Sequence, residues 1–230
     1  MADEVGLVVC QSFSCNISRC VRLSCALALV SGTTYVLYKY IKKSTEFSRN
    51  DFKETAPFIR QVLFFPDKKI ACKSFLSGVN CSRSICPYAH EDTSLSKLIK
   101  TIMKAKSTLD VCVFTINCHE LANAVVELHK KGVVVRILTD DEQMGSSGSQ
   151  IQKFREQGIR VRHDLSSFFM HHKFVIIDNC LIANGSFNWT RQAVTGNREN
   201  VVITNEAQIV KAFSEEFEKL WIEYDPASRS

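Results

Sequence analysis

Residues 168–190, FFMHHKFVIIDNCLIANGSFNWT, place two histidines, a lysine and an aspartate within a run of strand-forming residues. Side chains alternate between the two faces of a strand, so we expect His171 and Lys173 to share one face. An imidazole can attack phosphorus or move a proton near neutral pH, and a neighbouring ammonium can hold phosphate oxygens. The pair therefore predicts chemistry at a phosphate group.

Asp178 belongs to the same run of polar residues but has the opposite parity. From the other face of the strand it cannot touch the phosphate that His171 and Lys173 would hold. Its predicted role is therefore structural, to hold a neighbouring loop. His172 also falls on this second face, where we expect it to pack or form a hydrogen bond rather than take part in catalysis.

A second group of candidate residues follows in LIANGSFNWT and NRENVVIT. Ser186 and Asn188 share parity and could both donate to a phosphate oxygen, while Gly185 allows close backbone approach. Ser186 is not expected to be a nucleophile, because no G-x-S-x-G motif surrounds it. Glu199 begins a predicted strand, where its carboxylate could orient the histidine through the second ring nitrogen. An ordinary charge at a strand end is the alternative.

These residues resemble a known signature when their spacing is written out. The order His171-x-Lys173-x4-Asp178-x6-Gly185-Ser186-x-Asn188 is similar, at every defined position, to the HKD motif of the phospholipase D superfamily. The chain most resembles the mitochondrial phospholipase D, or Zucchini, branch, over residues 20–225. The segments that carry this resemblance, in order, are VLFFP, a Cys/His cluster, MHHKF, GSFNWT and NREN.

The resemblance implies a location and two substrate classes. Members of this branch are proteins of the mitochondrial outer membrane whose catalytic domain faces the cytosol. They are described as cardiolipin hydrolases and as endoribonucleases in piRNA production. For this chain the resemblance implies a metal-independent phosphodiesterase that forms a phosphohistidine intermediate.

The motif occurs only once, although this chemistry needs two histidines, one to attack phosphorus and one to protonate the leaving oxygen. A second H-x-K sequence, His129-Lys130-Lys131, meets Arg136 where aspartate is required, and no Gly-Ser follows it. It lies at the end of a predicted helix, so we expect a solvated helix terminus. The simplest conclusion is a homodimer that joins two copies of His171 across a two-fold axis.

Beyond residue 94 the apolar residues alternate between helical and strand spacing, which predicts an α/β domain. Together with the resemblance, this implies a phospholipase D-like mixed sheet flanked by helices, with one HKD motif per chain. We expect strands at 62–66, 109–116, 133–140 and 159–164, and helices at 94–107, 119–132, 146–158 and 206–224.

Cys72, Cys81, Cys86 and His90 form a C-x8-C-x4-C-x3-H pattern. Three thiolates and one imidazole suit a closed tetrahedral shell for structural zinc. The spacing resembles that of CCCH zinc fingers and predicts a small module over residues 72–90. Reduced cysteines beside an exposed histidine are the alternative.

The first 45 residues differ in composition from the rest of the chain. Residues 23–38 carry no charge, and arginines precede this run while lysines follow it, as in an uncleaved single-pass membrane anchor. A cleaved presequence and a buried helix are the alternatives. The expected organisation is a tail at 1–22, a transmembrane anchor at 23–43, a linker at 44–61 and a catalytic domain at 62–230.

Composition constrains the partners only loosely. The 230 residues carry a formal net charge of +5, which favours anionic partners such as nucleic acid or acidic lipid. The ten cysteines do not follow the regular spacing of a disulfide framework, which indicates a reducing compartment facing the cytosol.

Three functions stay open at this point: a cardiolipin hydrolase, an endonuclease for single-stranded RNA, and a catalytically inactive scaffold or RNA-binding protein. The intact motif disfavours the third. Residues 168–170 could form a site wall or pack in the core, and apolar exposure there would favour a lipid substrate. Lys97, Lys100 and Lys104 could guide a polyanion, although a solvated helix face is the alternative.

Overall fold

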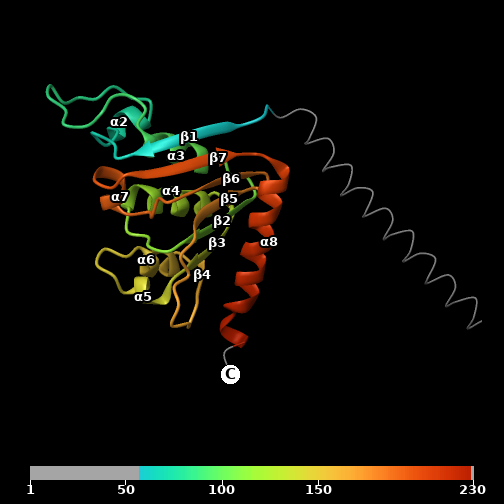
Figure 1. The fold of residues 1–230 in the computed structure, drawn as a ribbon. Helices are drawn as coiled ribbons and strands as arrows, with labels where there is room; N and C mark the ends of the chain where they lie inside the picture. The colour runs from blue at the N-terminus through green and yellow to red at the C-terminus, as the bar shows by residue number, and fades with distance from the viewer. Residues whose placement is uncertain (1–56, 229–230) are drawn as a thin grey trace, which may run out of the picture. The chain divides into compact units, whose positions relative to one another are not determined.

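The computed structural model describes residues 57–228 (Figure 1). Their centre is a seven-stranded mixed sheet in the order β1-β7-β6-β5-β2-β3-β4. The strands are β1 Arg60–Phe65, β2 Thr108–Val113, β3 Val134–Thr139, β4 Arg160–His163, β5 Lys173–Ile177, β6 Leu181–Gly185 and β7 Glu199–Thr204. The helices are α2 Lys73–Leu76, α3 Ser94–Ile102, α4 His119–Lys130, α5 Asp141–Met144, α6 Ile151–Glu156, α7 Arg191–Thr195 and α8 Ala207–Glu223, followed by the 3-10 turn Pro226–Ser228.

The directions of the strands bring the polar segments together at one end of the central strands. β2, β3 and β4 run parallel, while β2 and β5, β5 and β6, and β6 and β7 pair antiparallel. The end of β2 therefore lies beside the start of β5, because Val113 pairs with Lys173. In the same way, Gly185 at the end of β6 pairs with Val201 near the start of β7. Residues that are far apart in sequence thus meet at this end of the strands.

The two faces of the sheet bury different helices. Val175 and Ile177 of β5 join the larger core with residues of α3, α4 and α6. Phe174 and Ile176 point to the other face and join a smaller core with Phe217 and other residues of α8. Figure 1 shows α8 running along one side of the sheet, with α3, α4 and α6 on the other. The predicted alternation of side chains along β5 is confirmed.

The four predicted helices and the predicted strands are all present, with different boundaries in several places. β1 begins at Arg60, two residues before the prediction, because Arg60 and Gln61 pair with Thr204 and Ile203. The helix expected at 146–158 is limited to α6, since the Gly- and Ser-rich residues before Ile151 form turns. The mixed sheet flanked by helices confirms the α/β fold class.

The expected tail and membrane anchor, residues 1–22 and 23–43, lie outside the described residues, as does most of the linker at 44–61. Over residues 57–228, none of the helices has the length and apolar character needed to cross a membrane.

Candidate active site

His171 and Lys173 lie at this end of the central strands, beside Phe114, which follows β2. β5 begins at Lys173, so His171 precedes the strand rather than lying within it, which corrects the expectation that both are strand residues. The His171 ring is 4.7 Å from the Phe114 ring, centroid to centroid, and Lys173 Nζ lies 5.1 Å from the same ring. Lys173 Nζ also donates to the backbone carbonyl of His171 at 2.7 Å. The two candidate side chains are therefore held together on one aromatic ring.

Both candidate groups have pKa values below their ordinary values. Partial burial lowers the pKa of His171, and the charge of Lys173 lowers it further, against an opposing effect of Asp140. Burial also lowers the pKa of Lys173, although the carboxylate of Glu199 opposes that shift. A lowered pKa keeps His171 neutral, which is the form that can attack phosphorus.

Asp178 lies in the tight turn between β5 and β6, away from His171. Its carboxylate accepts hydrogen bonds from the backbone N–H groups of three successive residues, Lys106, Ser107 and Thr108, at 2.7–3.2 Å. These residues form the connection that enters β2. The geometry matches the structural role predicted for Asp178, because the carboxylate joins the β5–β6 turn to the neighbouring segment.

Ser186 and Glu199 contact each other across β6 and β7. Ser186 Oγ donates to Glu199 Oε2 and accepts from the backbone N–H of Asn200 at 3.2 Å. Asn197 Nδ2 donates to the other carboxylate oxygen of Glu199 at 3.0 Å. These hydrogen bonds of Glu199 lie within its own chain and do not include His171. The orienting role expected for Glu199 and the phosphate contact expected for Ser186 stay predictions.

Gly185 provides the close backbone approach that the sequence suggests, but toward β7. A Cβ atom at this position would lie 2.0 Å from the backbone oxygen of Asn200. Glycine is therefore required for the pairing that positions Ser186 beside Glu199.

Asn188 follows β6, and its side chain is half-buried. Its Oδ1 atom is buried without a hydrogen-bond partner in the described residues. A buried polar atom of this kind normally has a partner, so Asn188 retains an unsatisfied acceptor at the edge of the site. Its predicted contact with a phosphate oxygen is not tested by this geometry.

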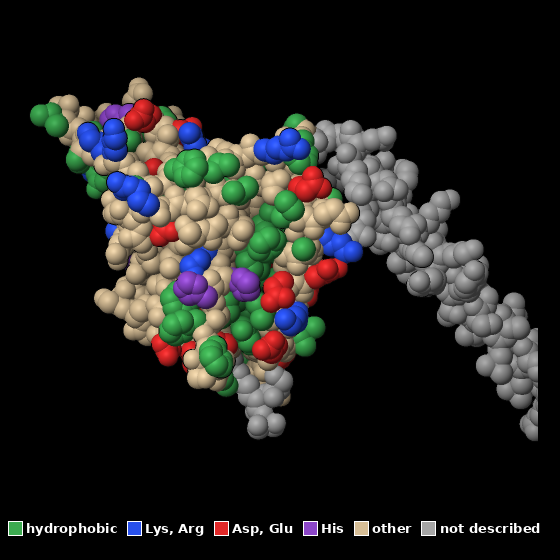
Figure 2. Space-filling model, in the orientation of Figure 1, with side chains coloured by type: hydrophobic (Ala, Val, Ile, Leu, Met, Phe, Trp, Pro, Cys, Tyr) green, Lys and Arg blue, Asp and Glu red, His purple; other side chains and the backbone are tan. Residues whose placement is uncertain are grey.

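The residues before His171 divide between surface and core. Phe168 and Phe169 are 82% and 58% exposed, whereas Met170 is 4% exposed and packs in the smaller core. The Phe169 ring contacts the Phe114 ring at 5.3 Å between centroids. Figure 2 shows hydrophobic side chains next to exposed histidines on one face of the molecule. Two exposed aromatic rings therefore adjoin the candidate nucleophile.

The other histidines singled out in the sequence take the expected positions. His172 lies against the Phe174 ring and 3.8 Å from Glu216 of α8. His129 lies in the last turn of α4, which ends at Lys130, so the second H-x-K sequence is a helix terminus.

Comparison with known proteins agrees with this arrangement. The sequence model of the family described as "Cardiolipin synthase, PLD-like domain" matches residues 98–221. The mitochondrial cardiolipin hydrolase of Chlamydomonas reinhardtii is 48% identical over 161 residues, covering 70% of this chain and 72% of that protein. The chain belongs to the phospholipase D-like family of mitochondrial cardiolipin hydrolases.

A second relative supports this assignment, and a solved structure shows the same fold. The mitochondrial cardiolipin hydrolase of Xenopus tropicalis is 48% identical over 171 residues, covering 74% of this chain and 80% of that protein. The phospholipase D family member Nuc from Salmonella typhimurium has the same fold, with a TM-score of 0.57 and 24% identity. The match covers 72% of this chain and 95% of that chain. As a member of this family, the protein is a hydrolase of the phosphodiesterase type.

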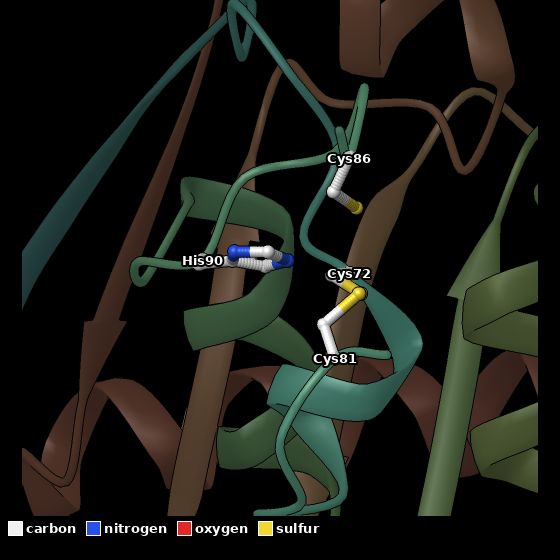
Figure 3. Close-up of side chains that lie close together, drawn as sticks. All are labelled: Cys72, Cys81, Cys86 and His90. Carbon is white, nitrogen blue, oxygen red and sulfur yellow. The ribbon is translucent and has the colours of Figure 1, made fainter. Parts of the chain in front are cut away.

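The Cys/His cluster of this family member lies apart from His171, in the segment between β1 and α3. Figure 3 shows Cys72, Cys81, Cys86 and His90 pointing toward one another. One ligand atom from each lies within 4.8 Å of the others, and the three cysteines are not in disulfides. The sequence pattern therefore corresponds to one cluster in space.

One distance within the cluster equals that expected between two ligands of a zinc ion. Thiolates that bind zinc at about 2.3 Å in a tetrahedron lie roughly 3.8 Å apart, and the Sγ atoms of Cys72 and Cys81 are 3.8 Å apart. A hydrogen bond from the Phe75 backbone lowers the pKa of Cys72 to about 6, with a smaller contribution from His90. A thiolate is the form that ligates a metal, so Cys72 is suited to bind an ion, whereas burial and the neighbouring Cys72 raise the pKa of Cys81. The four side chains together could hold a structural ion.

Two further residues lie at this end of the strands, and the HKD motif does not indicate either of them. Phe114 contacts His171, and Asp140 accepts a hydrogen bond from the Met170 backbone at 3.1 Å. Each lies near the end of a predicted strand, 109–116 or 133–140. The pairing order of the strands is the missing information, because it decides which strand ends meet.

Proposed function

We propose that the protein is a homodimeric, metal-independent phosphodiesterase that hydrolyses cardiolipin to phosphatidic acid and phosphatidylglycerol. The exposure of Phe168 and Phe169 beside His171 carries this proposal, because a lipid substrate needs an apolar approach to the nucleophile. The names of the relatives supply the substrate class. Lys173 provides a positive charge for the phosphate.

The reaction takes two steps. His171 attacks phosphorus, a P–N bond forms, and the bond from phosphorus to the leaving oxygen breaks. The partner's His171, in its protonated form, donates a proton to that oxygen. The same residue then accepts a proton from water, which attacks phosphorus and breaks the P–N bond, so that both histidines return to their first states.

A homodimer supplies the second histidine. The HKD motif occurs once in the sequence, and a two-fold axis near His171 would place two copies around one phosphate. In this arrangement Ser186 and Asn188 line the phosphate site, where the Ser186 hydroxyl and the Asn188 amide Nδ2 would donate to phosphate oxygens. Glu199 orients a histidine once the dimer has formed.

The cellular location follows the family. We propose a single-pass anchor at residues 23–43 in the mitochondrial outer membrane, with the catalytic domain facing the cytosol. Free cysteines agree with a reducing compartment. Zinc at Cys72, Cys81, Cys86 and His90 would be structural and would take no part in the chemistry.

Single-stranded RNA is the second candidate substrate, for endonucleolytic cleavage in piRNA production. The exposed Lys97 on α3 and the exposed Lys104 just after this helix support this possibility, since lysines attract a polyanion. Lys100 forms an ion pair with Asp92, which reduces its availability. A catalytically inactive scaffold is the remaining alternative.

The test compares both substrates with one protein preparation. The full-length protein and its His171→Asn variant are reconstituted into cardiolipin-containing bilayers without added metal, and labelled single-stranded RNA is supplied in parallel. We expect phosphatidic acid release by the intact protein and a loss of at least about 100-fold in the variant. His172→Asn is the matched control. RNA cleavage without lipid hydrolysis would assign the nuclease function instead, and activity of His171→Asn would exclude the mechanism.

Mixing experiments test the shared site. If two copies of His171 form one centre, a random 1:1 mixture of intact and His171→Asn chains should retain roughly a quarter of the activity per total protein. Retention of half would indicate that each chain acts alone.

A further inference from the structure

The segment 165–169, here called the aromatic loop, lies between β4 and His171, which precedes β5. We propose that this loop inserts into the headgroup region of an anionic phospholipid bilayer and holds the active site at the depth of the lipid phosphates. The inference rests on the proposed function in taking a membrane lipid as the substrate. It adds a distinct membrane contact, separate from the expected anchor, that determines substrate preference.

The aromatic loop exposes large apolar side chains to water. Leu165 is 65% exposed, Phe168 82% and Phe169 58%, whereas the intervening Ser166 and Ser167 are small and uncharged. Three of the five side chains are therefore large, apolar and exposed to water. Apolar segments of this kind at a protein surface mark contacts with another protein or a membrane.

The structure holds both ends of the aromatic loop in place. Before the loop, Asp164 is buried and its Oδ1 accepts from the backbone N–H of Asp141 at 3.2 Å. After the loop, the backbone N–H of Met170 donates to Asp140 Oδ2 at 3.1 Å, and the Met170 side chain is buried. Anchored ends keep the apolar side chains at the surface instead of allowing them to fold back into the core.

The aromatic loop is connected to the nucleophile through one ring. Phe114 contacts Phe169 on one side and His171 on the other, at 5.3 Å and 4.7 Å between ring centroids. Lys173 Nζ lies 5.1 Å from the same ring. The apolar surface is therefore continuous with the residues that would bind the phosphate.

The charges within the loop suit an anionic bilayer, and of the carboxylates at its ends Asp140 and Asp164 are buried and Asp141 is half-buried. Residues 165–173, LSSFFMHHK, include no acidic side chain and end in two histidines and a lysine. Aromatic rings favour the membrane interface, and an inserted apolar surface enters it by about 5–10 Å. The phosphates of the lipid lie in this interface. Insertion of Phe168 would therefore bring His171 and Lys173 to the level of their substrate.

The first test measures insertion directly. Phe168→Trp is introduced into the full-length His171→Asn protein, which is reconstituted into nanodiscs that contain cardiolipin and brominated phospholipid. We expect bromine to quench the new tryptophan more strongly than in the Ile222→Trp control, because Ile222 is comparably exposed, at 69%, but lies on α8. Equal quenching at the two positions would overturn the proposal. The native tryptophans are buried and contribute the same background to both variants.

The second test measures the consequence for catalysis. We expect Leu165→Ser/Phe168→Ser to lower the ratio of cardiolipin hydrolysis in bilayers to hydrolysis of soluble bis(p-nitrophenyl) phosphate by roughly tenfold per removed side chain. Ile222→Ser should leave this ratio unchanged. An unchanged ratio in the loop variant would overturn the proposal, as would loss of the dimer, which would assign the loop to a contact between subunits.

The two tests separate this inference from the proposed function. Preferential quenching of the Phe168→Trp probe in a protein that cleaves only RNA would retain the membrane contact and reject the lipid substrate. Cardiolipin hydrolysis without preferential quenching would retain the substrate and reject the contact. A selective loss of RNA cleavage in the loop variant would assign the rings to base stacking and overturn the membrane proposal.

Discussion

The Oδ1 atom of Asp178 accepts a hydrogen bond from the backbone N–H of Ser107 at 2.7 Å, across 71 positions of sequence. The same carboxylate accepts from the two residues that flank Ser107. The aspartate of the HKD motif therefore fastens the β5–β6 turn to the entry of β2, while the histidine and lysine lie at the opposite end of β5. The HKD motif thus places its reactive residues at one end of β5 and its structural aspartate at the other end.

Replacement of Asp178 should reduce stability more than chemistry. Asp178 has a φ of 50°, a conformation that asparagine also tolerates, so Asp178→Asn removes the charge without new backbone strain. We expect the free energy of unfolding to fall by about 1–3 kcal/mol, because the hydrogen bonds to the three N–H groups lose their charge assistance and the amide Nδ2 cannot accept from Lys106. Urea unfolding would measure this change. Asp92→Asn, which breaks an exposed pair with Lys100, should cost less than Asp178→Asn.

Gly185→Ala should disrupt the pairing of β6 with β7. The added Cβ would lie 2.0 Å from the Asn200 backbone oxygen, so one strand must move. We expect the free energy of unfolding to fall by about 1–3 kcal/mol, as for other overpacked sites. Activity should fall as well. Gly145→Ala is the control, since its Cβ would meet nothing within 4 Å. Equal effects of the two substitutions in urea unfolding would contradict this explanation.

The pH dependence of activity should follow the lowered pKa of His171. Burial and then Lys173 lower this pKa from 6.5, so the neutral nucleophile persists to more acidic pH. We expect the acidic limb of kcat/KM against pH to lie below 6.5. In Lys173→Met, loss of the neighbouring positive charge should raise the pKa of His171, which NMR titration of the imidazole would measure. Lys131→Met, at the end of α4, should leave it unchanged, and a fall in Lys173→Met would contradict the assignment.

Zinc binding should stabilise the segment between β1 and α3. At a free zinc concentration of about 100 times the Kd, the free energy of unfolding should exceed that of the zinc-free protein by about 2.7 kcal/mol. Cys81→Ser should abolish this difference and remove zinc from the purified protein, as measured by elemental analysis. Cys180→Ser, in the β5–β6 turn outside the cluster, should retain both properties. Equal zinc content in the two variants would reject the cluster as the metal site.

Brief chelation should spare catalysis, because the proposed chemistry uses two histidines and no metal. We expect the initial rate of hydrolysis to change less than about twofold within the first minutes after EDTA is added, before a structural ion dissociates. A rate that falls at once and returns with magnesium would contradict the proposed mechanism. The control is the same assay after zinc has been restored.

Local patterns predict much of the fold and the grouping of the site residues. Alternation along β5 correctly separates Val175 and Ile177 from Phe174 and Ile176, because side-chain period is a local property of a strand. The parity of Asp178 likewise indicates its structural role without knowledge of its partners. The Cys/His spacing predicts a cluster that the fold brings together.

Contacts that depend on strand order cannot be predicted in this way. The sequence around Phe114 does not indicate that its ring will lie beside His171, since this requires β2 and β5 to be antiparallel neighbours. The sequence favours a contact of Glu199 with a histidine, whereas its hydrogen bonds within the chain go to Ser186 and Asn197. The exposure of Phe168 also depends on tertiary structure, because an aromatic residue before a strand can pack in either direction.

The position of β1 has a consequence for the order of assembly during synthesis. β1 is the first strand of the sheet to be translated, yet its one neighbour in the sheet is β7, whose residues 199–204 come near the end of the chain. The parallel strands β2, β3 and β4 can pair while the ribosome is still completing the protein. β1 has no strand to pair with until β7 has been synthesised. A nascent polypeptide that stalls before residue 199 therefore leaves β1 unpaired and is prone to aggregate.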